Sequence, residues 1–283
     1  MQVLVPPAMQ DALGELAAGG GRVLAGGTDL MVAINFGRER PDRVVAVGGL
    51  RELREVSIDG TVRCGAGVTY TRMMQELGDS TPVLREAART VGSPQIRNAG
   101  TVGGNLGTCS PAGDTLPVLA ALDATVILRS SSGQRRVPFA AYMQGPRRLD
   151  LGADELIEAV EWARPRGPQV FMKAGTRNAM VISVAMLALV VDRERRRVGL
   201  GIGSVAPTIV RPEAAERFAE DVFADADWAR PPQVTPAVAA RFGELAVAAI
   251  KPIDDVRGTI AYRRHIVGVM AARALTRAAE QDL

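Results

Sequence analysis

Two short segments with adjacent glycines constrain this 283-residue chain more than any other feature of its sequence. Residues 23–30 read VLAGGTDL, and residues 101–106 read TVGGNL. Glycine has no Cβ atom, so it adopts positive φ values and lets another group come close to the backbone. The N–H groups of such a segment can converge on an anion, and a pyrophosphate is the anion that two segments together would hold.

Neither segment has the spacing of a familiar nucleotide-binding motif. Both lack the Rossmann fingerprint G-x-G-x-x-G, and neither ends in the lysine and hydroxyl residue of a P-loop. Nucleoside triphosphate chemistry is therefore disfavoured. The alternative is that both segments are simple turns, because the chain contains 30 glycines.

The composition is that of a globular protein, with 47% hydrophobic and 23% charged residues. The length suffices for one large domain or two ordinary ones. The net charge of +3 is too small to indicate nucleic-acid binding. The basic clusters at residues 147–148 and 193–197 also lack the interleaved aromatic residues that stack on bases.

The cysteines exclude one class of site and indicate a compartment. Cys64 and Cys109 are the only two and lie far apart, which excludes a self-contained iron–sulfur or zinc site. We expect reduced thiols in a cytoplasmic protein. Residues 1–7 do not have the pattern of a signal peptide, and the apolar run at 179–191 is too short for a transmembrane segment.

Helix and strand patterns predict an α+β chain with a boundary inside the Pro/Gly-rich stretch 164–168. We expect one domain over residues 1–166, with lobes of about 1–54 and 55–166, and a second over residues 167–283. The second lobe begins with a hairpin around Asp59-Gly60. The second domain opens with strands at 181–191 and 198–205, and helices follow at 213–218, 236–249 and 259–280.

Residues 23–30 and the longer stretch 92–105, which each contain one of the glycine pairs, resemble one protein family. Residues 92–105 read GSPQIRNAGTVGGN, and matching stretches follow at 110–117, 203–208, 255–258 and 262–264. In this order they resemble the FAD-binding medium subunit, or domain, of the molybdenum hydroxylases, which include carbon monoxide dehydrogenase and xanthine dehydrogenase. The resemblance extends over nearly the whole chain.

The resemblance implies a fold and a cofactor. The fold is a two-lobed FAD-binding domain of the vanillyl-alcohol-oxidase and murein-reductase type, followed by a smaller sheet-and-helix C-terminal domain. The cofactor is FAD. The positions that match the FAD contacts of the family are Val23, Leu24, Ala25, Gly26, Gly27, Thr28, Asp29, Leu30, Thr101, Val102, Gly103, Gly104, Asn105, Ser110, Asp114, Ile157 and Lys173.

Three of these positions also have simpler explanations. Asp114 precedes the helix predicted from residue 115 and is a favoured N-cap residue, so we expect it to serve both purposes. Ile157 lies in an apolar strand and also suits a place in the core. Lys173 and Lys251 are the only lysines of an arginine-rich chain, and a compact charge at Lys173 would suit a binding site.

The function implied by the resemblance is electron transfer inside a larger oxidoreductase. Electrons would leave a molybdenum centre, pass through [2Fe-2S] clusters, reach FAD on this chain and continue to an external acceptor. The implied partners are a large molybdenum-cofactor subunit and a small iron–sulfur subunit, paired as a dimer of heterotrimers. We expect no catalytic residue and no metal ligand on this chain, whose only histidine is His265.

Two other functions remain open. One is a self-sufficient FAD-dependent oxidase or reductase, which would turn over its substrate without partners. The other is an interaction scaffold that binds no flavin and in which the glycine segments are turns.

Overall fold

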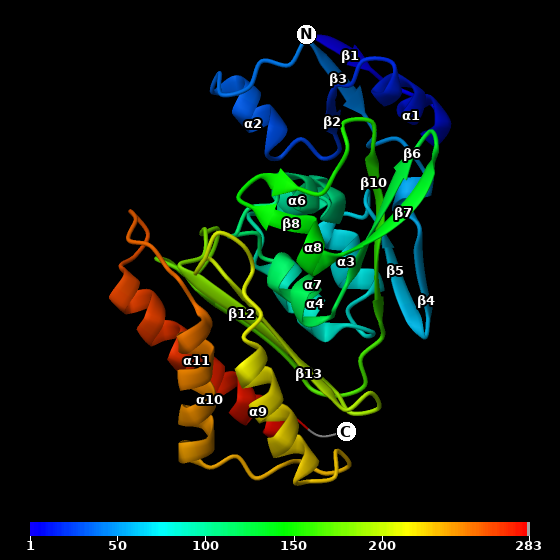
Figure 1. Cartoon of the computed structure of the whole chain (residues 1–283). Helices are drawn as coiled ribbons and strands as arrows, with labels where there is room; N and C mark the ends of the chain where they lie inside the picture. Colours follow the sequence, from blue (N-terminus) through cyan, green and yellow to red (C-terminus); the bar gives the residue numbers. More distant parts are fainter. Residues whose placement is uncertain (282–283) are drawn as a thin grey trace.

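A computed structural model of the chain describes residues 1–281, and a small parallel sheet forms its N-terminal lobe (Figure 1). The strands lie in the order β1-β3-β2, so neighbouring strands come from distant parts of the lobe. Leu13 and Leu16 of the first helix are buried in the main core. The elements of this lobe are β1 (Gln2–Leu4), α1 (Met9–Ala17), β2 (Arg22–Leu24), α2 (Leu30–Asn35) and β3 (Arg43–Ala46).

The middle lobe contains a five-stranded antiparallel sheet in the order β4-β5-β10-β6-β7. The predicted hairpin is present, because Asp59 pairs with Thr61 across Gly60, whose φ is +61°. The strands are β4 (Val56–Asp59), β5 (Thr61–Gly65), β6 (Thr125–Ser130), β7 (Gly133–Pro138) and β10 (Leu156–Ala163). Helices and a small hairpin complete the lobe: η1 (Glu52–Arg54), α3 (Tyr70–Glu76), α4 (Pro82–Arg89), α5 (Pro94–Ala99), α6 (Val102–Thr108), α7 (Leu116–Ala121), α8 (Phe139–Tyr142), β8 (Met143–Gly145) and β9 (Arg148–Leu149).

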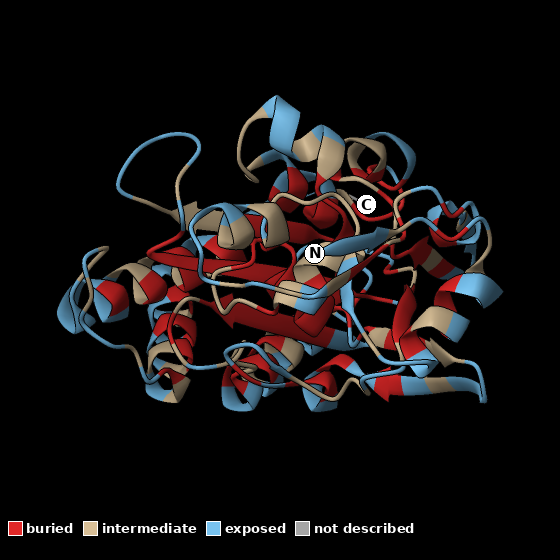
Figure 2. Ribbon diagram, turned by 90° about the horizontal axis from the view of Figure 1, so that it is seen from above, coloured by how far each residue is buried: buried red, intermediate tan, exposed pale blue. Residues whose placement is uncertain are grey.

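The C-terminal unit is a three-stranded antiparallel sheet with helices on its outer side (Figure 1). Its elements are β11 (Gln169–Ala174), β12 (Ala185–Asp192), β13 (Arg197–Gly203), α9 (Glu213–Ala224), α10 (Pro236–Ala249) and α11 (Ile260–Glu280). The central strand β12 is buried along its whole length. Figure 2 shows buried strands in the middle of the molecule, with exposed residues around them.

Strand β12 divides its side chains between two hydrophobic cores. Met186, Ala188 and Val190 belong to the core shared with the first two lobes. Leu187 and Leu189 belong to the core beneath α9, α10 and α11. Side chains alternate between the two faces of a strand, so a strand with cores on both faces is apolar throughout. This burial explains the continuous apolar run in the sequence and joins the C-terminal unit to the rest of the molecule.

Glycines on one face of β13 let α7 lie directly against the sheet. A Cβ atom at Gly199 would overlap the carbonyl oxygen of Ala121, and one at Gly201 would overlap that of Pro117. Only glycine tolerates a backbone this close. The alternating glycines therefore determine how near the middle lobe approaches the C-terminal sheet.

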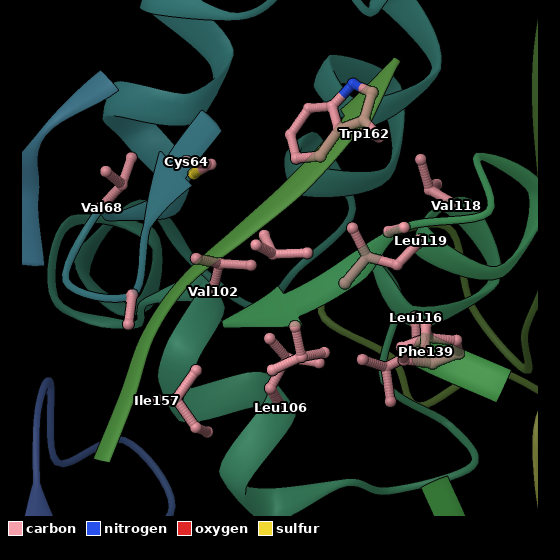
Figure 3. Packing of buried hydrophobic residues seen from close by; sticks show 14 of the residues in the cluster. Cys64, Val68, Val102, Leu106, Leu116, Val118, Leu119, Phe139, Ile157 and Trp162 are labelled. Carbon is pink, nitrogen blue, oxygen red and sulfur yellow. The ribbon is translucent and has the colours of Figure 1, made fainter. Parts of the chain in front are cut away.

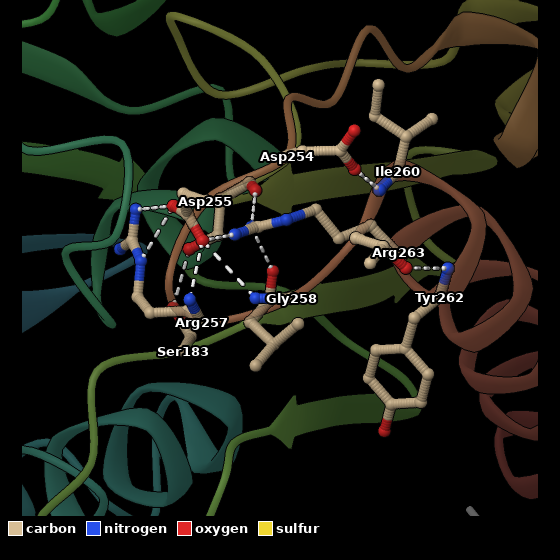
Figure 4. A network of polar contacts seen from close by, with 11 residues as sticks. Ser183, Asp254, Asp255, Arg257, Gly258, Ile260, Tyr262 and Arg263 are labelled. Carbon is tan, nitrogen blue, oxygen red and sulfur yellow. Dashed lines mark hydrogen bonds and ion pairs between the residues drawn. The ribbon is translucent and has the colours of Figure 1, made fainter.

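A buried arginine holds the start of α11 to the same sheet (Figure 4). Arg263 donates to the carbonyl oxygens of Val184 at 2.5 Å and Ser204 at 2.6 Å, and to Asp255 Oδ1 at 2.6 Å. Asp255 also pairs with Arg257. Hydrogen bonds on several sides compensate for the burial of a charge, so the network can be stable although Arg263 is 1% exposed.

The observed fold confirms the predicted class, an α+β arrangement of two lobes and a smaller sheet-and-helix unit. Three elements differ from expectation. The helix predicted at 213–218 continues to Ala224. The glycine pair of residues 101–106, predicted to form a loop, lies in the first turn of α6. The strand expected from residue 181 begins at Ala185, after a turn. The boundary between residues 166 and 167 stays a prediction. Within residues 1–281, no helix combines the length and apolar character needed to cross a membrane.

The close packing of α7 on the glycines of β13 predicts that one added methyl group lowers the stability of the protein substantially. We expect Gly199→Ala to lower the free energy of unfolding by about 2–3 kcal/mol, because α7 must move away from the sheet. Urea denaturation measures this loss. Gly14→Ala is the control, because a Cβ there has no neighbour within 4 Å. In an exposed helix position it should stabilise by about 0.5–1 kcal/mol. Equal stability of Gly199→Ala and the native chain would contradict the packing described.

The Arg263 network predicts a dependence of stability on pH. Hydrogen bonds and charges from Arg257 and Arg263 outweigh burial and hold the pKa of Asp255 well below its usual range. A lowered folded-state pKa adds stability that is complete above the unfolded pKa and is lost as pH falls. We expect Asp255→Asn to cost about 2–3 kcal/mol at pH 7. The cost should shrink by about 1 kcal/mol at about pH 3. The exposed Asp221→Asn is the matched control, and a cost that did not depend on pH would count against the network.

Candidate functional site

A cavity of about 860 Å³ lies between the N-terminal and middle lobes. Both glycine segments line it, the first through residues 23–30 and the second through Thr101, Gly103, Gly104 and Asn105. The end of β9 and its connection to β10 form another part of the wall, through Leu149 and Leu151. The two segments, more than 70 residues apart in sequence, therefore share one cleft.

A missing side chain at Gly26 allows the two segments to meet. A Cβ atom at Gly26 would overlap the carbonyl oxygen of Ala99, the last residue of α5. The first segment thus rests directly on the backbone that leads into α6. A second contact lies farther along, where the Thr108 hydroxyl donates to Asp29 Oδ2 at 3.2 Å.

The first segment presents unused backbone donors to the cavity. Within residues 1–281, no hydrogen bond uses the N–H groups of Gly26, Gly27, Thr28 or Asp29. Gly27 has a φ of +72°, in the left-handed region where glycine is favoured. Since N–H groups without a partner are rare in folded chains unless water or a ligand reaches them, these four are suited to bind an anion.

The second segment was also predicted to direct its N–H groups at an anion, but in the structure these groups bond within the protein. Val102 N donates to Val68 O at 3.1 Å, and Gly103 N to Ala66 O at 2.9 Å. Gly104 N donates to the side chain of Thr101, which caps α6. These donors are therefore used to build the helix and fix it on the middle lobe. Gly103 serves the same contact, because a Cβ there would lie 2.6 Å from the Cβ of Ala66.

Helix α6 forms in spite of its glycines because it buries an apolar face. Val102 and Leu106, four residues apart, lie on one side of the helix and point into the core beside β10 (Figure 3). Ile157 of β10 is near them, and it is both part of this core and part of the cavity wall. The β-bulge between Ile157 and Ala159 changes the register of β10 at this wall.

Tyr70 is a cavity residue that the sequence gave no reason to select. It follows the N-cap Thr69 of α3, and its ring packs against Gly100. Burial, followed by the negative charges of Asp114 and Asp29, raises the pKa of Tyr70 far above its usual range. Its hydroxyl is therefore a neutral donor. Other cavity residues missed by the prediction include Asn98, which lies within the stretch 92–105, and Arg147, Leu149 and Leu151, which no motif marks.

Four of the predicted FAD contacts lie outside this cavity lining. The side chain of Val102 is in the core, and Ser110 Oγ accepts from Ala112 N at 3.2 Å within a turn. Asp114 and Lys173 pair with each other elsewhere. The remaining predicted positions, including Ile157, all line the cavity. Their roles as FAD contacts stay predictions.

Asp114 and Lys173 form a buried ion pair between the middle lobe and the C-terminal sheet. Lys173 Nζ lies 2.6 Å from Asp114 Oδ2, and both side chains are 8% exposed. Thr90 Oγ1 donates to the same oxygen at 3.1 Å. Asp114 Oδ1 is buried and has no hydrogen-bond partner in the described part of the chain. The predicted N-cap role is wrong, because α7 begins after Thr115 and Asp114 bonds to Lys173 and Thr90 instead.

The residues of the cavity fit a dinucleotide such as FAD. Four free N–H groups in one loop offer donors to a diphosphate, and arginines at positions 22, 38, 54 and 147 line the same space. Leucines and Ile157 supply apolar wall for ring systems. A cleft that combines apolar wall with polar and charged groups is suited to a cofactor.

Comparisons with known proteins indicate the same cofactor. A family described as the FAD binding domain in molybdopterin dehydrogenase matches residues 1–162, and the CO dehydrogenase flavoprotein C-terminal domain matches residues 171–278. The glyceraldehyde dehydrogenase medium chain of Sulfolobus acidocaldarius is 30% identical over 266 residues, which is 89% of this chain and 89% of that protein. The nicotinate dehydrogenase FAD-subunit of Eubacterium barkeri is 39% identical over 170 residues, only 57% of either chain.

A solved structure extends the likeness to the whole fold. The reconstituted CO dehydrogenase from Oligotropha carboxidovorans contains a chain that superposes with a TM-score of 0.89 at 25% identity. The superposition covers 100% of this chain and 98% of that one. The two lobes and the C-terminal unit are therefore arranged as they are in that chain.

The Asp114–Lys173 pair predicts a pH effect that removal of its lysine enlarges. Burial raises the pKa of Asp114 above its ordinary value, although Lys173 and Thr90 lower it. In Lys173→Met the folded state should keep a proton on Asp114 at higher pH than the unfolded state does. Stability then falls as pH rises above about 4, with a slope of up to about 1.4 kcal/mol per pH unit. Urea denaturation at a series of pH values measures this slope. The double variant Lys173→Met/Asp114→Asn should lack it, and parallel curves for the two variants would disprove the assignment.

Proposed function

Because the chain belongs to the family of FAD-subunits of the molybdenum hydroxylases, we propose that it receives electrons from iron–sulfur clusters of a partner subunit and passes them to an external acceptor. The observation that carries the proposal is the shared cleft, with its free N–H groups at residues 26–29. Bound FAD would supply the redox chemistry, and the protein would supply position and electrostatics.

The chain's own residues would hold the cofactor without covalent attachment. The N–H groups of Gly26, Gly27, Thr28 and Asp29 would bind oxygens of the diphosphate, each bond to a charged group contributing roughly 1.5–3 kcal/mol. Helix α6 and Ile157 would form further parts of the cavity wall. Tyr70 would offer a neutral hydroxyl donor. The Asp114–Lys173 pair would contribute at the junction with the C-terminal unit. Asp114 Oδ1 has no hydrogen-bond partner among the described residues and can accept a further hydrogen bond there.

We further propose the partners and the setting of the subunit. With only two cysteines, both buried, the chain needs another subunit to hold [2Fe-2S] clusters. A large molybdenum-cofactor subunit would oxidise the substrate, and the assembly would be a dimer of heterotrimers in the cytoplasm. Relatives named medium chain and FAD-subunit support this division of labour. We propose that residues 1–166 form the FAD-binding domain and residues 167–283 the C-terminal flavoprotein domain.

Flavin binding by the isolated chain tests the proposed site. We expect the purified chain to take up FAD with flavin absorbance bands, and Gly26→Ala to raise the dissociation constant at least about tenfold, or 1.4 kcal/mol. The reason is that the added Cβ pushes the first segment off Ala99. Gly49→Ala is the control, because a Cβ there meets nothing within 4 Å. Failure of the unaltered chain to bind added FAD would refute the proposal.

Gentle co-purification tests the partner assignment. We expect two further subunits, with molybdenum and iron in the complex but no metal in the isolated chain. Substrate should be oxidised by the complex and not by this polypeptide alone. Turnover by the isolated flavoprotein, with no companion subunits, would favour a self-sufficient oxidase or reductase.

A further inference from the structure

Arg147 occupies an unusual place at the edge of the cavity. Gly145 pairs with Arg148, so Pro146 and Arg147 are the two central residues of the turn between β8 and β9. Arg147 has a φ of +58°. A two-residue turn that has proline first and a positive φ second is normally completed by glycine or asparagine. An arginine there is held in a backbone conformation that it disfavours.

The hairpin is anchored to the helix that carries the second glycine pair. Asp150 N donates to Tyr142 O at 2.9 Å, and the Tyr142 hydroxyl donates to Leu106 O in α6 at 3.4 Å. Asp150 also pairs with Arg135 at 2.9 Å. Figure 1 shows β8 beside α6. The turn that carries Arg147 is therefore held beside the cleft by the contacts of Tyr142, which precedes it, and of Asp150, which follows it.

The backbone conformation alone would not mark a site. Arg196 has a similar φ of +50° in a surface turn and does not line the cavity. Among non-glycine residues of the described chain with left-handed φ, Arg147 alone is part of the cavity lining. Strained backbone that places a charged side chain in a cleft is a recognised sign of function.

The other arginines of the cavity already have partners. Arg22 Nε lies 2.9 Å from Glu39 Oε2, Arg38 lies over the ring of Phe36, and Arg54 donates to the carbonyl oxygen of Gly48. The side chain of Arg147 makes no hydrogen bond, ion pair or ring contact within residues 1–281. The cavity thus has one uncommitted cation among the residues described.

We propose that Arg147 is the cation that pairs with the diphosphate of bound FAD, in the same cavity that the free N–H groups of residues 26–29 line. This inference rests on the proposed function. Oxidised FAD is anionic at its diphosphate, and a guanidinium matches two phosphate oxygens at once. Neutral N–H donors and one full positive charge together give the site its preference for a dianion.

Titration of the full-length apoprotein with FAD, followed by quenching of flavin fluorescence, tests the assignment. Because Arg147 is exposed and its charge is screened by water, we expect Arg147→Gln to raise the dissociation constant about fivefold at low salt. The difference in dissociation constant between this variant and the unaltered chain should become smaller at about 0.5 M salt. Arg147→Lys should keep most of the affinity, because it keeps the charge.

Two further variants separate charge from conformation. Arg148→Gln removes the neighbouring arginine, which lies outside the cavity lining, and should bind FAD like the unaltered chain. Arg147→Gly relieves the backbone strain, so it should raise the melting temperature while weakening FAD binding as much as Arg147→Gln. Equal affinity of Arg147→Gln and the unaltered chain would overturn the inference and leave the proposed function intact. If the unaltered chain bound no FAD, both would fall.

Discussion

The candidate site depends on one close backbone contact, that of Gly26 with Ala99. The contact exists because Gly26 has no side chain, and it seats the first glycine segment on the residue that ends α5. From this position the segment lines the same cavity as α6, with the N–H groups of residues 26–29 free. A larger residue at position 26 would separate the two lobes at the point where an anion would bind.

The second half of the molecule is fixed by a different use of glycine. Alternating glycines on β13 let α7 lie against the sheet, and β12 contributes side chains to cores on both of its faces. This packing brings Lys173 of β11 to Asp114, which immediately precedes the first turn of α7. A charged pair can be buried there because Lys173 pairs with Asp114 Oδ2 and Thr90 donates to the same oxygen. The position of this ion pair thus follows from the packing of α7 on the sheet.

Much of this arrangement was predictable from the sequence, for identifiable reasons. Helices such as α10, with Thr235 as N-cap and Pro236 in its first turn, carry strong local signals. The hairpin at Gly60 was predictable from the Asp59-Gly60 turn sequence alone. The glycine pair at residues 103–104 was harder, because glycines suggest a loop, whereas Thr101 as N-cap and the buried Val102 and Leu106 make a helix. The capping threonine was the signal that could have corrected the prediction.

Residues whose places depend on tertiary packing were beyond sequence reasoning. Tyr70 and Arg147 reach the cavity through the way α3 and the β8–β9 turn pack, and no motif surrounds them. The resemblance to a family supplied Asp114 and Lys173 but not their pairing with each other. Glycine has two roles in this molecule. It accompanies free N–H groups at residues 26–29, and it provides a packing surface at Gly103 and on β13. The sequence does not distinguish these roles, and only the fold does.

Hydrogen exchange of the chain with and without FAD measures the central claim most directly. Free N–H groups exchange quickly, and those held in hydrogen bonds exchange slowly. We predict strong new protection of residues 26–29 when FAD binds, with little change at residues 102–105, whose N–H groups already have partners. New protection at residues 102–105 with none at residues 26–29 would contradict the account.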